Sequence, residues 1–207
     1  MTGDVLLTDL PDEGCTFIRG PPISGKYDLL IDLLASSTEG AIVLSTKYSA
    51  ARVIDDLHEA GYDPDAPLGI IDCATSAIDH NADVVASIKR VDGPENLSRI
   101  GVAFTELADT MSEQSAGDRV LVGIHSLGQL VVNNDIRSVY RFLQTLSGQV
   151  RSAGWREIVV MDVPVSPDED GAILEHHADC VLDLIDGEAE HQLRIRGKQG
   201  QLKPASD

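Results

Sequence analysis

Short apolar runs alternate with longer amphipathic segments from one end of this 207-residue chain to the other. The runs VLVGI, which ends at Ile124, and IVVM, which precedes Asp162, are apolar at successive rather than alternate positions. This pattern is typical of parallel strands that are covered on both faces. We therefore predict an α/β fold in which a mostly parallel sheet is flanked by helices on both faces. The expected strands are Cys15–Arg19, Ala41–Ser45, Leu68–Asp72, Val120–Ile124, Ile158–Asp162, Cys180–Ile185 and Gln192–Arg196, and the expected helices are Lys26–Ala35, Ser49–Ala60, Asn96–Glu113, Ile136–Ala153 and the shorter Ala172–His177.

The end of the chain and one internal stretch depart from this alternation. The last two expected strands are separated only by the polar segment DGEAEH, which predicts a C-terminal antiparallel hairpin. The polar stretch 72–94 predicts an irregular insertion with one short strand near Val84–Lys89. Because the length suits one domain with a substantial core, we expect residues 1–207 to form a single domain whose tail, 201–207, frays.

The chain is strongly acidic. It has 34 Asp and Glu residues against 16 Lys and Arg, and the resulting formal charge of −18 is spread along the sequence. Such a surface repels a nucleic-acid backbone, so nucleic acid is not an expected partner. Lysine and aromatic residues are scarce, a balance that resembles proteins of salt-loving archaea, where high salt screens the repulsion between carboxylates. We therefore expect a halophilic archaeal protein, with an acidic mesophilic protein as the alternative.

Neither a membrane segment nor a disulfide framework is apparent. No run approaches the roughly 20 apolar residues that span a bilayer, and the N-terminal MTGDVLLTDLPDEG lacks the features of a signal peptide. The three cysteines, Cys15, Cys73 and Cys180, lie in or beside apolar runs without C-x-x-C spacing. We interpret them as buried free thiols in a reducing compartment, and we expect a cytoplasmic protein without a membrane partner.

A glycine-rich segment, GPPISGKY at residues 20–27, joins the first expected strand to the first expected helix. It matches the phosphate-binding pattern G-x-x-x-x-G-K-[ST] at Gly20, Gly25 and Lys26, while Ile23 replaces a residue that is commonly glycine. Glycines suit such a loop because backbone N–H groups converge on the phosphates at a helix N-terminus. The loop makes ATP or ADP the candidate ligand. The candidate binding residues are Gly20, Pro21, Pro22, Ile23, Ser24, Gly25, Lys26 and Tyr27.

The residues that would complete metal-assisted hydrolysis are replaced. Tyr27 stands where a Ser or Thr hydroxyl would hold Mg²⁺, and its phenolic oxygen lies farther from the backbone. The apolar strand RVLVGI is followed by His125, and the apolar strand AIVLST is followed by Lys47 and Tyr48. An ATPase of this class needs carboxylates at these places. We expect that Mg²⁺ is not held in the usual way and that ATP hydrolysis is weak or absent.

Several stretches carry a family resemblance. Beside the phosphate loop they are NLSRIGVAFTELADTM, then RVLVGIHSLGQLVVNNDIRSVYRFLQTLSGQVRSAG, then HADCVLDL followed by LRIRGKQG. In this order they resemble the RecA/KaiC superfamily of P-loop proteins, and more closely a group of haloarchaeal KaiC-like proteins, some labelled "HTR-like". The resemblance spans most of the chain and implies a RecA/KaiC-like P-loop core.

The resemblance also assigns positions to the motifs of the superfamily. Gly20–Tyr27 would be the Walker A loop and Val120–His125 the Walker B strand, with His125 in place of the superfamily's aspartate. Lys47 and Tyr48 would stand where KaiC-like ATPases have a glutamate pair that contains the general base. Both Walker motifs would then be degenerate.

The segment Arg194–Gly200 resembles the one that sends basic side chains toward a neighbour's nucleotide in hexameric KaiC-like rings. Arg196 and Lys198 are therefore candidate contacts in trans. Gln199 stands near a position that is usually arginine, which weakens this comparison.

Some polar residues allow two interpretations. For His125 the alternatives are a switch, a distant metal ligand or, as the commoner case, a hydrogen-bonded scaffold residue, and Ser126 beside it lacks the G-x-S-x-G elbow of a hydrolase. The pair His176–His177 beside Asp179 suggests a metal site. Adjacent helical side chains point about 100° apart, so a surface helix end is favoured and no metal ligand is assigned. Asp162 is the one carboxylate placed to compensate for the missing metal ligand.

Three functions follow from these observations. The favoured one is a regulatory or scaffolding protein that binds nucleotide weakly and does not turn it over. The second is an active ATPase that assembles into a ring and receives groups in trans. The third is a protein-interaction module with an empty nucleotide site. A homo-oligomer or a protein partner is expected under each of them.

Overall fold

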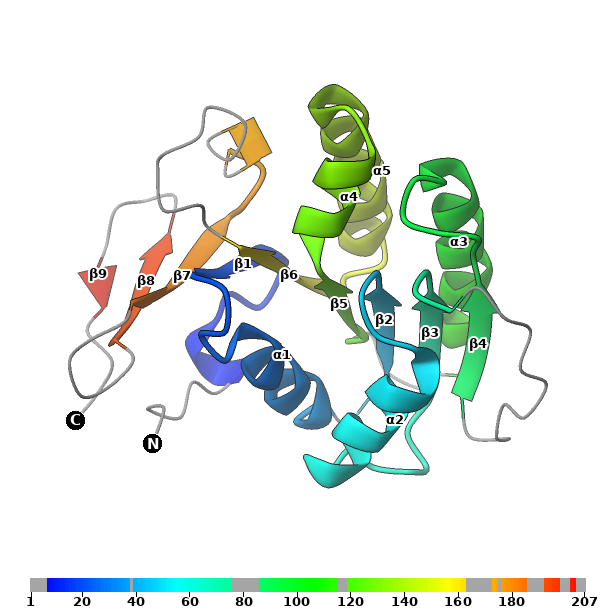
Figure 1. Cartoon of the computed structure of the whole chain (residues 1–207). Coiled ribbons are helices and arrows are strands. Elements are labelled where there is room, and N and C mark those ends of the chain that lie inside the picture. Colours follow the sequence, from blue (N-terminus) through cyan, green and yellow to red (C-terminus); the bar gives the residue numbers. More distant parts are fainter. Residues whose placement is uncertain are drawn as a thin grey trace.

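The computed structural model describes residues 7–37, 39–75, 86–114, 119–162, 173–174, 176–185, 192–197 and 202–203. Over these residues the chain forms a nine-stranded sheet in the order β4-β3-β2-β5-β6-β1-β7-β8-β9 (Figure 1). The strands are β1 Gly14–Gly20, β2 Ala41–Ser45, β3 Leu68–Asp72, β4 Ala86–Arg90, β5 Leu121–His125, β6 Arg156–Asp162, β7 Cys180–Ile185, β8 Gln192–Gly197 and β9 Leu202–Lys203. The helices are the short 3-10 helix η1 Leu7–Asp9 and the α-helices α1 Lys26–Ala35, α2 Ala50–Glu59, α3 Leu97–Gln114, α4 Leu127–Asn133 and α5 Ile136–Ser152.

The sheet is mostly parallel, as predicted. The seven neighbouring strands from β4 to β7 all pair in parallel, and β8 and β9 follow antiparallel at one edge. The antiparallel pairing expected between the last two predicted strands is present between β7 and β8, with Cys180 opposite Gly197. Within the tail expected to fray, Leu202–Lys203 pairs with β8, and the rest of that tail lies outside the described residues.

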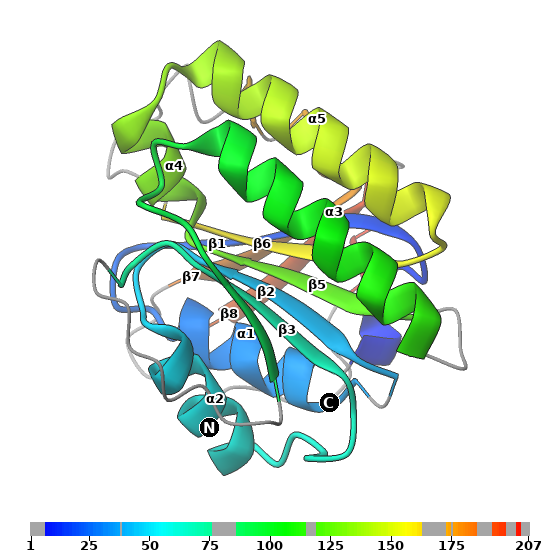
Figure 2. The same ribbon diagram turned by 90° about the vertical axis from the view of Figure 1, so that its right-hand side faces the viewer.

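Helices cover both faces of the sheet (Figures 1 and 2). One face carries α1 and α2, and the other carries α3, α4 and α5. Successive strand residues enter opposite cores: Phe17 packs on the side of α3 and α5, and Ile18 packs on the side of α1 and α2. Because both faces of each central strand are covered, apolar side chains stand at successive positions in runs such as Ile42–Leu44 of β2 and Ile158–Met161 of β6.

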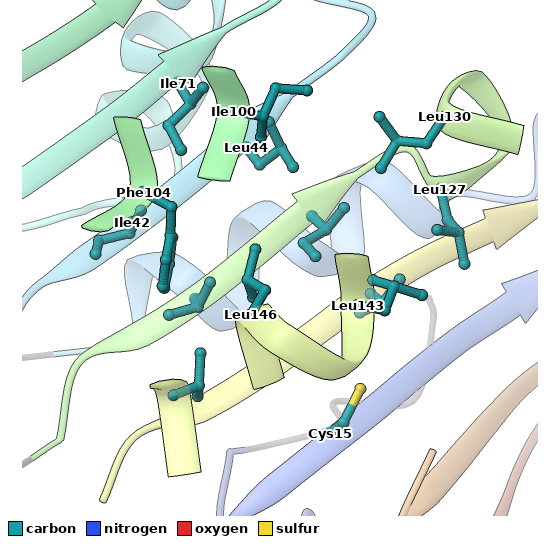
Figure 3. Close-up of a cluster of buried hydrophobic side chains, with 14 of the residues drawn as sticks. Cys15, Ile42, Leu44, Ile71, Ile100, Phe104, Leu127, Leu130, Leu143 and Leu146 are labelled. Atoms are coloured by element: carbon teal, nitrogen blue, oxygen red, sulfur yellow. The ribbon is translucent and has the colours of Figure 1, made fainter. Parts of the chain in front are cut away.

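The core beneath α3 and α5 holds large side chains that are almost fully buried (Figure 3). Ile100 and Phe104 reach it from α3, and Leu143 and Leu146 reach it from α5. Burial of each such side chain stabilises the fold by roughly 1.5–3 kcal/mol. These contacts fix α5 against β1 and β6 and so hold the polar groups at its inner face in place.

The structure differs from the sequence prediction in a few elements. α4 was not predicted, because its seven residues are too short for a helical period to show, and it forms by burying Leu127 and Leu130. The short strand expected near Val84–Lys89 is β4, an edge strand parallel to β3. Of the helix expected at Ala172–His177, only Ile173 and Leu174 are helical among the described residues.

None of the described helices combines the length and the apolar character needed to cross a membrane. All three cysteines are buried free thiols, as predicted. β2, β5, β6 and β1 are direct neighbours, so their carboxyl ends form one continuous edge. In open α/β sheets this edge is where ligands bind, and here it collects the loops that follow four different strands.

Candidate functional site

The segment between β1 and α1 is a tight loop at this carboxyl edge. Gly25 directly precedes α1 with φ 77° and ψ 10°, in the left-handed region that glycine adopts at little cost. A Cβ on Gly20 would lie 2.7 Å from Ser24 Oγ and 3.0 Å from the Leu184 carbonyl oxygen. The two glycines of the predicted phosphate loop are therefore required by its backbone, one by conformation and the other by space.

Ile23 occupies an unusual conformation within the same loop. Its φ is 65°, and its side chain is fully exposed to solvent. A β-branched residue at positive φ is a true outlier, at a cost of about 1–2 kcal/mol. The loop thus has a shape that glycine would adopt at this position without strain, although the residue is isoleucine.

Lys26 points into the loop rather than toward solvent, with only 5% of its surface exposed. Its ammonium donates hydrogen bonds to Ser24 Oγ at 3.1 Å and to the Pro21 carbonyl oxygen. It also lies 2.9 Å from Asp162 Oδ1 at the end of β6. The Asp162 side chain is 49% exposed, so this ion pair has one buried member and one that water reaches.

Three aromatic rings meet beside the loop. Tyr27 from the first turn of α1 contacts Tyr48 edge-on with ring centroids 4.7 Å apart, and contacts His125 at 4.5 Å. Tyr48 stacks on His125 with centroids 5.1 Å apart and planes 13° from parallel. We call Tyr27, Tyr48 and His125 the aromatic cluster. These are three of the four replaced positions that the sequence identified, and the fold packs their rings against one another.

The cluster is anchored to α2 by residues that the sequence did not single out. Tyr27 Oη donates to Asp56 Oδ2 at 2.7 Å, and Arg52 Nε lies 2.8 Å from both carboxylate oxygens of Asp56. The Arg52 guanidinium also lies 5.6 Å from the centre of the Tyr48 ring. Burial and then the Asp56 hydrogen bond raise the pKa of Tyr27, so its hydroxyl stays protonated as a donor.

His125 is buried and neutral. Burial lowers its pKa from 6.5 to about 4, the nearby charges of Lys47 and Lys26 also lower it, and Asp162 opposes them. Its Nδ1 is buried without a hydrogen-bond partner among the described residues. A neutral imidazole with one unpaired nitrogen thus lies at the end of β5.

The turns that follow β2 and β5 are joined by hydrogen bonds. The backbone N–H of Ser126 donates to Thr46 Oγ1 at 2.7 Å, and that hydroxyl donates to the Ser126 carbonyl oxygen at 3.0 Å. The backbone N–H of Thr46 donates to the His125 carbonyl oxygen. These bonds hold Tyr48 and His125 at a fixed separation.

The loop and the aromatic cluster surround a pocket of about 270 Å³. Its charged lining residues are the cations Lys26, Lys47 and Arg52 and the carboxylates Asp28 and Asp162. The pocket is therefore net positive in a chain whose formal charge is −18. Together with the first-turn N–H groups of α1, these cations make it suitable for an anion.

Most of the predicted site residues meet at this pocket. Its lining includes the following residues that the sequence identified: Ile23, Ser24, Gly25, Lys26, Tyr27, Lys47, Tyr48, His125 and Asp162. Gly20, Pro21 and Pro22 belong to the same loop. Arg52 and Asp56 were missed; their spacing of four residues on a helix is a common surface pattern and gives no functional signal.

Of the candidate trans contacts, the structure describes only the backbone of Arg196. Arg196 lies on β8 opposite Val181, which in turn pairs with Phe17 of β1, three residues before the loop begins. Lys198 lies outside the described residues. Their role therefore stays a prediction.

The His176–His177 pair is divided between two environments. His176 is exposed, in agreement with the surface position that the sequence favours, but His177 is buried. The two residues form a turn after Leu174 rather than a regular helix end, and this turn directs the His177 ring inward.

Comparisons with known proteins agree with this architecture. A family model described as "Family of unknown function (DUF7504)" matches residues 16–184. A search of curated proteins found no match. Among solved structures, the chain is similar to a KaiC-like protein from the hyperthermophilic archaeon Pyrococcus horikoshii, with a TM-score of 0.63 and 14% identity over 98% of this chain and 91% of that one. An uncharacterized protein from the same organism, solved in complex with an unknown peptide, has a TM-score of 0.64 and 16% identity over 90% of this chain and 84% of that one. The predicted RecA/KaiC-like core is confirmed.

Proposed function

The chain belongs to the DUF7504 family of unknown function, and from the pocket at its phosphate loop we propose that it is a nucleotide-binding regulatory or scaffolding protein that does not efficiently hydrolyse ATP. The observation that carries this proposal is the aromatic cluster, which occupies the metal and base positions beside an intact lysine-bearing loop. In this proposal both Walker motifs are degenerate and only the phosphate-binding half of the site is retained.

Phosphate binding is supported by the loop and its cations. Lys26 is held within reach of an anion in the pocket, because it already pairs with the carboxylate of Asp162. Lys47 and Arg52 line the opposite side and add positive charge. A triphosphate or diphosphate placed here would meet three cations and the N-terminus of α1.

The side chains around the pocket support nucleotide binding without a metal ion. Mg²⁺ requires near-octahedral oxygen ligands, and the Tyr27 hydroxyl is committed to Asp56. Among the described lining residues the remaining carboxylates are Asp28, on the exposed side of α1, and Asp162, which pairs with Lys26. Lys47 and Arg52 can instead supply the positive charge that Mg²⁺ brings to nucleotide phosphates in an ATPase.

Loss of hydrolysis is supported by the replacement of the residues at the position assigned to the general base. The position assigned to a general base holds Lys47 and Tyr48, and a protonated ammonium cannot accept a proton from water. His125 is neutral, but its ring packs against those of Tyr27 and Tyr48. Without a metal and with no base at the assigned position, bound ATP would act as a persistent ligand rather than a substrate.

We expect ATP binding to be independent of Mg²⁺. Titration calorimetry of the purified chain with ATP and with ADP, in molar KCl, is compared between buffer containing Mg²⁺ and buffer containing EDTA. The dissociation constants in the two buffers are expected to agree within about threefold, or to favour EDTA, because the pocket cations meet more negative charge on free ATP. Affinity that rises tenfold or more with Mg²⁺ would show that the pocket holds the metal, and absence of binding in both buffers would contradict the proposed function.

Replacing Asp162 with asparagine is expected to tighten ATP binding by about three- to tenfold. The carboxylate competes with phosphate for Lys26, and an asparagine at this position would keep the size of the side chain while removing the competing charge. The effect is modest because Asp162 is half exposed. The same calorimetry measures it, with Asp28→Asn as the control that removes a different lining carboxylate not paired with Lys26. Weaker binding in Asp162→Asn would instead assign Asp162 a role in holding a metal for a working ATPase.

A further inference from the structure

A second cluster of reactive side chains lies at the other end of the sheet from the nucleotide pocket. Cys15 is the second residue of β1 and Glu157 the second residue of β6, and the two are direct neighbours in the parallel register. Ser147 reaches them from α5, and His177 reaches them from the turn before β7. The Cys15 thiol lies on the α5 side of the sheet, in the same buried cluster as Leu143 and Leu146 (Figure 3).

The ligand atoms of three of these residues already lie close together. Cys15 Sγ, a carboxylate oxygen of Glu157 and a ring nitrogen of His177 are all within 4.8 Å of one another. Ser147 Oγ donates to Glu157 Oε2 and lies 2.6 Å from His177 Nε2. Four side chains from four segments therefore point at one small volume.

The cluster is buried, and one of its polar atoms has no partner. Cys15, Glu157 and Ser147 are each 1% exposed, and His177 is 8% exposed. Glu157 Oε1 makes no hydrogen bond to any described residue. Burying a carboxylate costs several kcal/mol unless a cation or hydrogen bonds compensate it.

The positive charge of Arg151 favours an ionised Glu157, but it is shared with a second carboxylate. Arg151 forms an ion pair with Asp179, whose carboxylate also accepts a hydrogen bond from the Cys15 backbone N–H at 3.0 Å. One guanidinium thus faces two carboxylates when Glu157 is ionised. The charge balance at this end of the sheet favours an added cation.

A hydrolytic triad does not fit these contacts. In such a triad the imidazole lies between the hydroxyl and the carboxylate, which orients it. Here Ser147 lies between His177 and Glu157. The hydroxyl is also buried, so a substrate could not reach it.

We propose that Cys15, Glu157 and His177 bind a zinc(II) ion, with Ser147 or a water molecule as the fourth ligand. Thiolate, carboxylate and neutral imidazole are the ligand types that Zn²⁺ uses, whereas Mg²⁺ and Ca²⁺ take oxygen ligands only. One thiolate and one carboxylate balance the charge of the ion, so the assembled centre is neutral and can be buried. Tetrahedral Zn²⁺ ligands lie roughly 3.3–3.8 Å apart, so the present group has to contract by about 1 Å, which side-chain rotation can supply.

The ion would act as a structural clamp. It would join β1, β6 and the turn that leads into β7, which are neighbours in the sheet but distant in the sequence. This centre lies at the amino ends of the strands, and the nucleotide pocket lies at their carboxyl ends, so neither proposal depends on the other.

Cobalt(II) is the probe, because it replaces Zn²⁺ in tetrahedral sites and absorbs visible light there. The purified 207-residue chain is stripped with a chelator and titrated with Co²⁺. We expect one equivalent to bind, with a thiolate-to-cobalt charge-transfer band and intense tetrahedral bands, and we expect one equivalent of Zn²⁺ to remove these bands. Failure to develop them, or cobalt uptake without a thiolate band, would overturn the proposal.

Variants identify the ligands. Glu157→Gln keeps the shape of the side chain and removes its buried charge, so the chain is expected to fold and to lose at least tenfold in cobalt affinity. His177→Ala is also expected to lose at least tenfold in cobalt affinity. Two controls should bind cobalt as the unmodified chain does: His176→Ala, which removes the exposed neighbouring histidine, and Cys73→Ser, which removes a buried thiol outside this cluster. Thermal unfolding in EDTA shows whether each variant is folded. Affinity that is unchanged in folded Glu157→Gln, or that depends on His176 rather than His177, would overturn the assignment.

Discussion

Replacing Lys26 with methionine is expected to weaken ATP binding by about ten- to a hundredfold, which is the effect of losing one charge-assisted hydrogen bond worth roughly 1.5–3 kcal/mol. Methionine keeps most of the aliphatic length of the side chain and fits the buried path that Lys26 follows through the loop. Asp162 loses its partner in this variant, but it is half exposed and can be hydrated. The loss should therefore appear in binding, measured by calorimetry, rather than in folding.

The matched control is Lys89→Met, which changes the net charge equally. Lys89 forms an exposed ion pair with Glu106, and β4 is separated from β1 by four strands. Its removal is expected to leave the dissociation constant of ATP within error. If Lys26→Met and Lys89→Met bind ATP equally well, Lys26 does not contact phosphate and the loop is only a structural remnant.

The pH dependence of stability should depend on His125. Because the pKa of His125 falls from 6.5 to about 4 on folding, the unfolded chain binds a proton in this range that the folded chain does not. The contribution of neutral His125 to the stability of the folded chain is therefore complete above pH 6.5 and is lost progressively as the pH falls toward 4. At about 1.4 kcal/mol for each pKa unit, the loss amounts to about 3 kcal/mol in the free energy of unfolding.

His125→Phe is the variant that isolates this effect. Phenylalanine keeps a ring against Tyr27 and Tyr48 but has no proton to gain, while Lys26, Lys47 and Asp162 remain in place. Urea unfolding of both chains is measured from pH 7 to pH 4, and other titrating groups cancel in the difference. We expect the unmodified chain to lose about 3 kcal/mol more than the variant over this range. Parallel pH profiles would show that His125 is hydrated or paired in the folded chain.

Much of the fold could be predicted from the sequence because the hydrophobic pattern of each strand or long helix lies within a short stretch of the chain. Runs such as Ile42–Leu44 and Ile158–Met161 are apolar at successive positions since both faces of the sheet are covered, and this pattern survives in a single sequence. α4 was not readable, since it depends on burying Leu127 and Leu130 against elements distant in the chain. Helices of seven residues owe their stability to such contacts rather than to their own pattern.

The sequence predicted the individual residues of the site but not how their side chains are arranged. Tyr27, Lys47, Tyr48 and His125 were each identified as replacements at positions where an ATPase needs other residues. That three of their rings contact one another depends on the order of β2, β5 and β1 in the sheet and on side-chain rotamers, which a sequence does not display. For the same reason His177 was expected on the surface beside His176, whereas the turn before β7 directs it into the core.

The measurement that tests the central claim most directly is ATP turnover under conditions where binding is saturated. The purified chain is assayed in molar KCl with Mg²⁺ and saturating ATP, over protein concentrations that would reveal groups supplied in trans by self-assembly. The account predicts bound ATP that is recovered intact, with turnover far below about 1 s⁻¹, the low end for competent enzymes. Turnover at or above that rate, abolished by Lys26→Met, would contradict it and would establish a working ATPase.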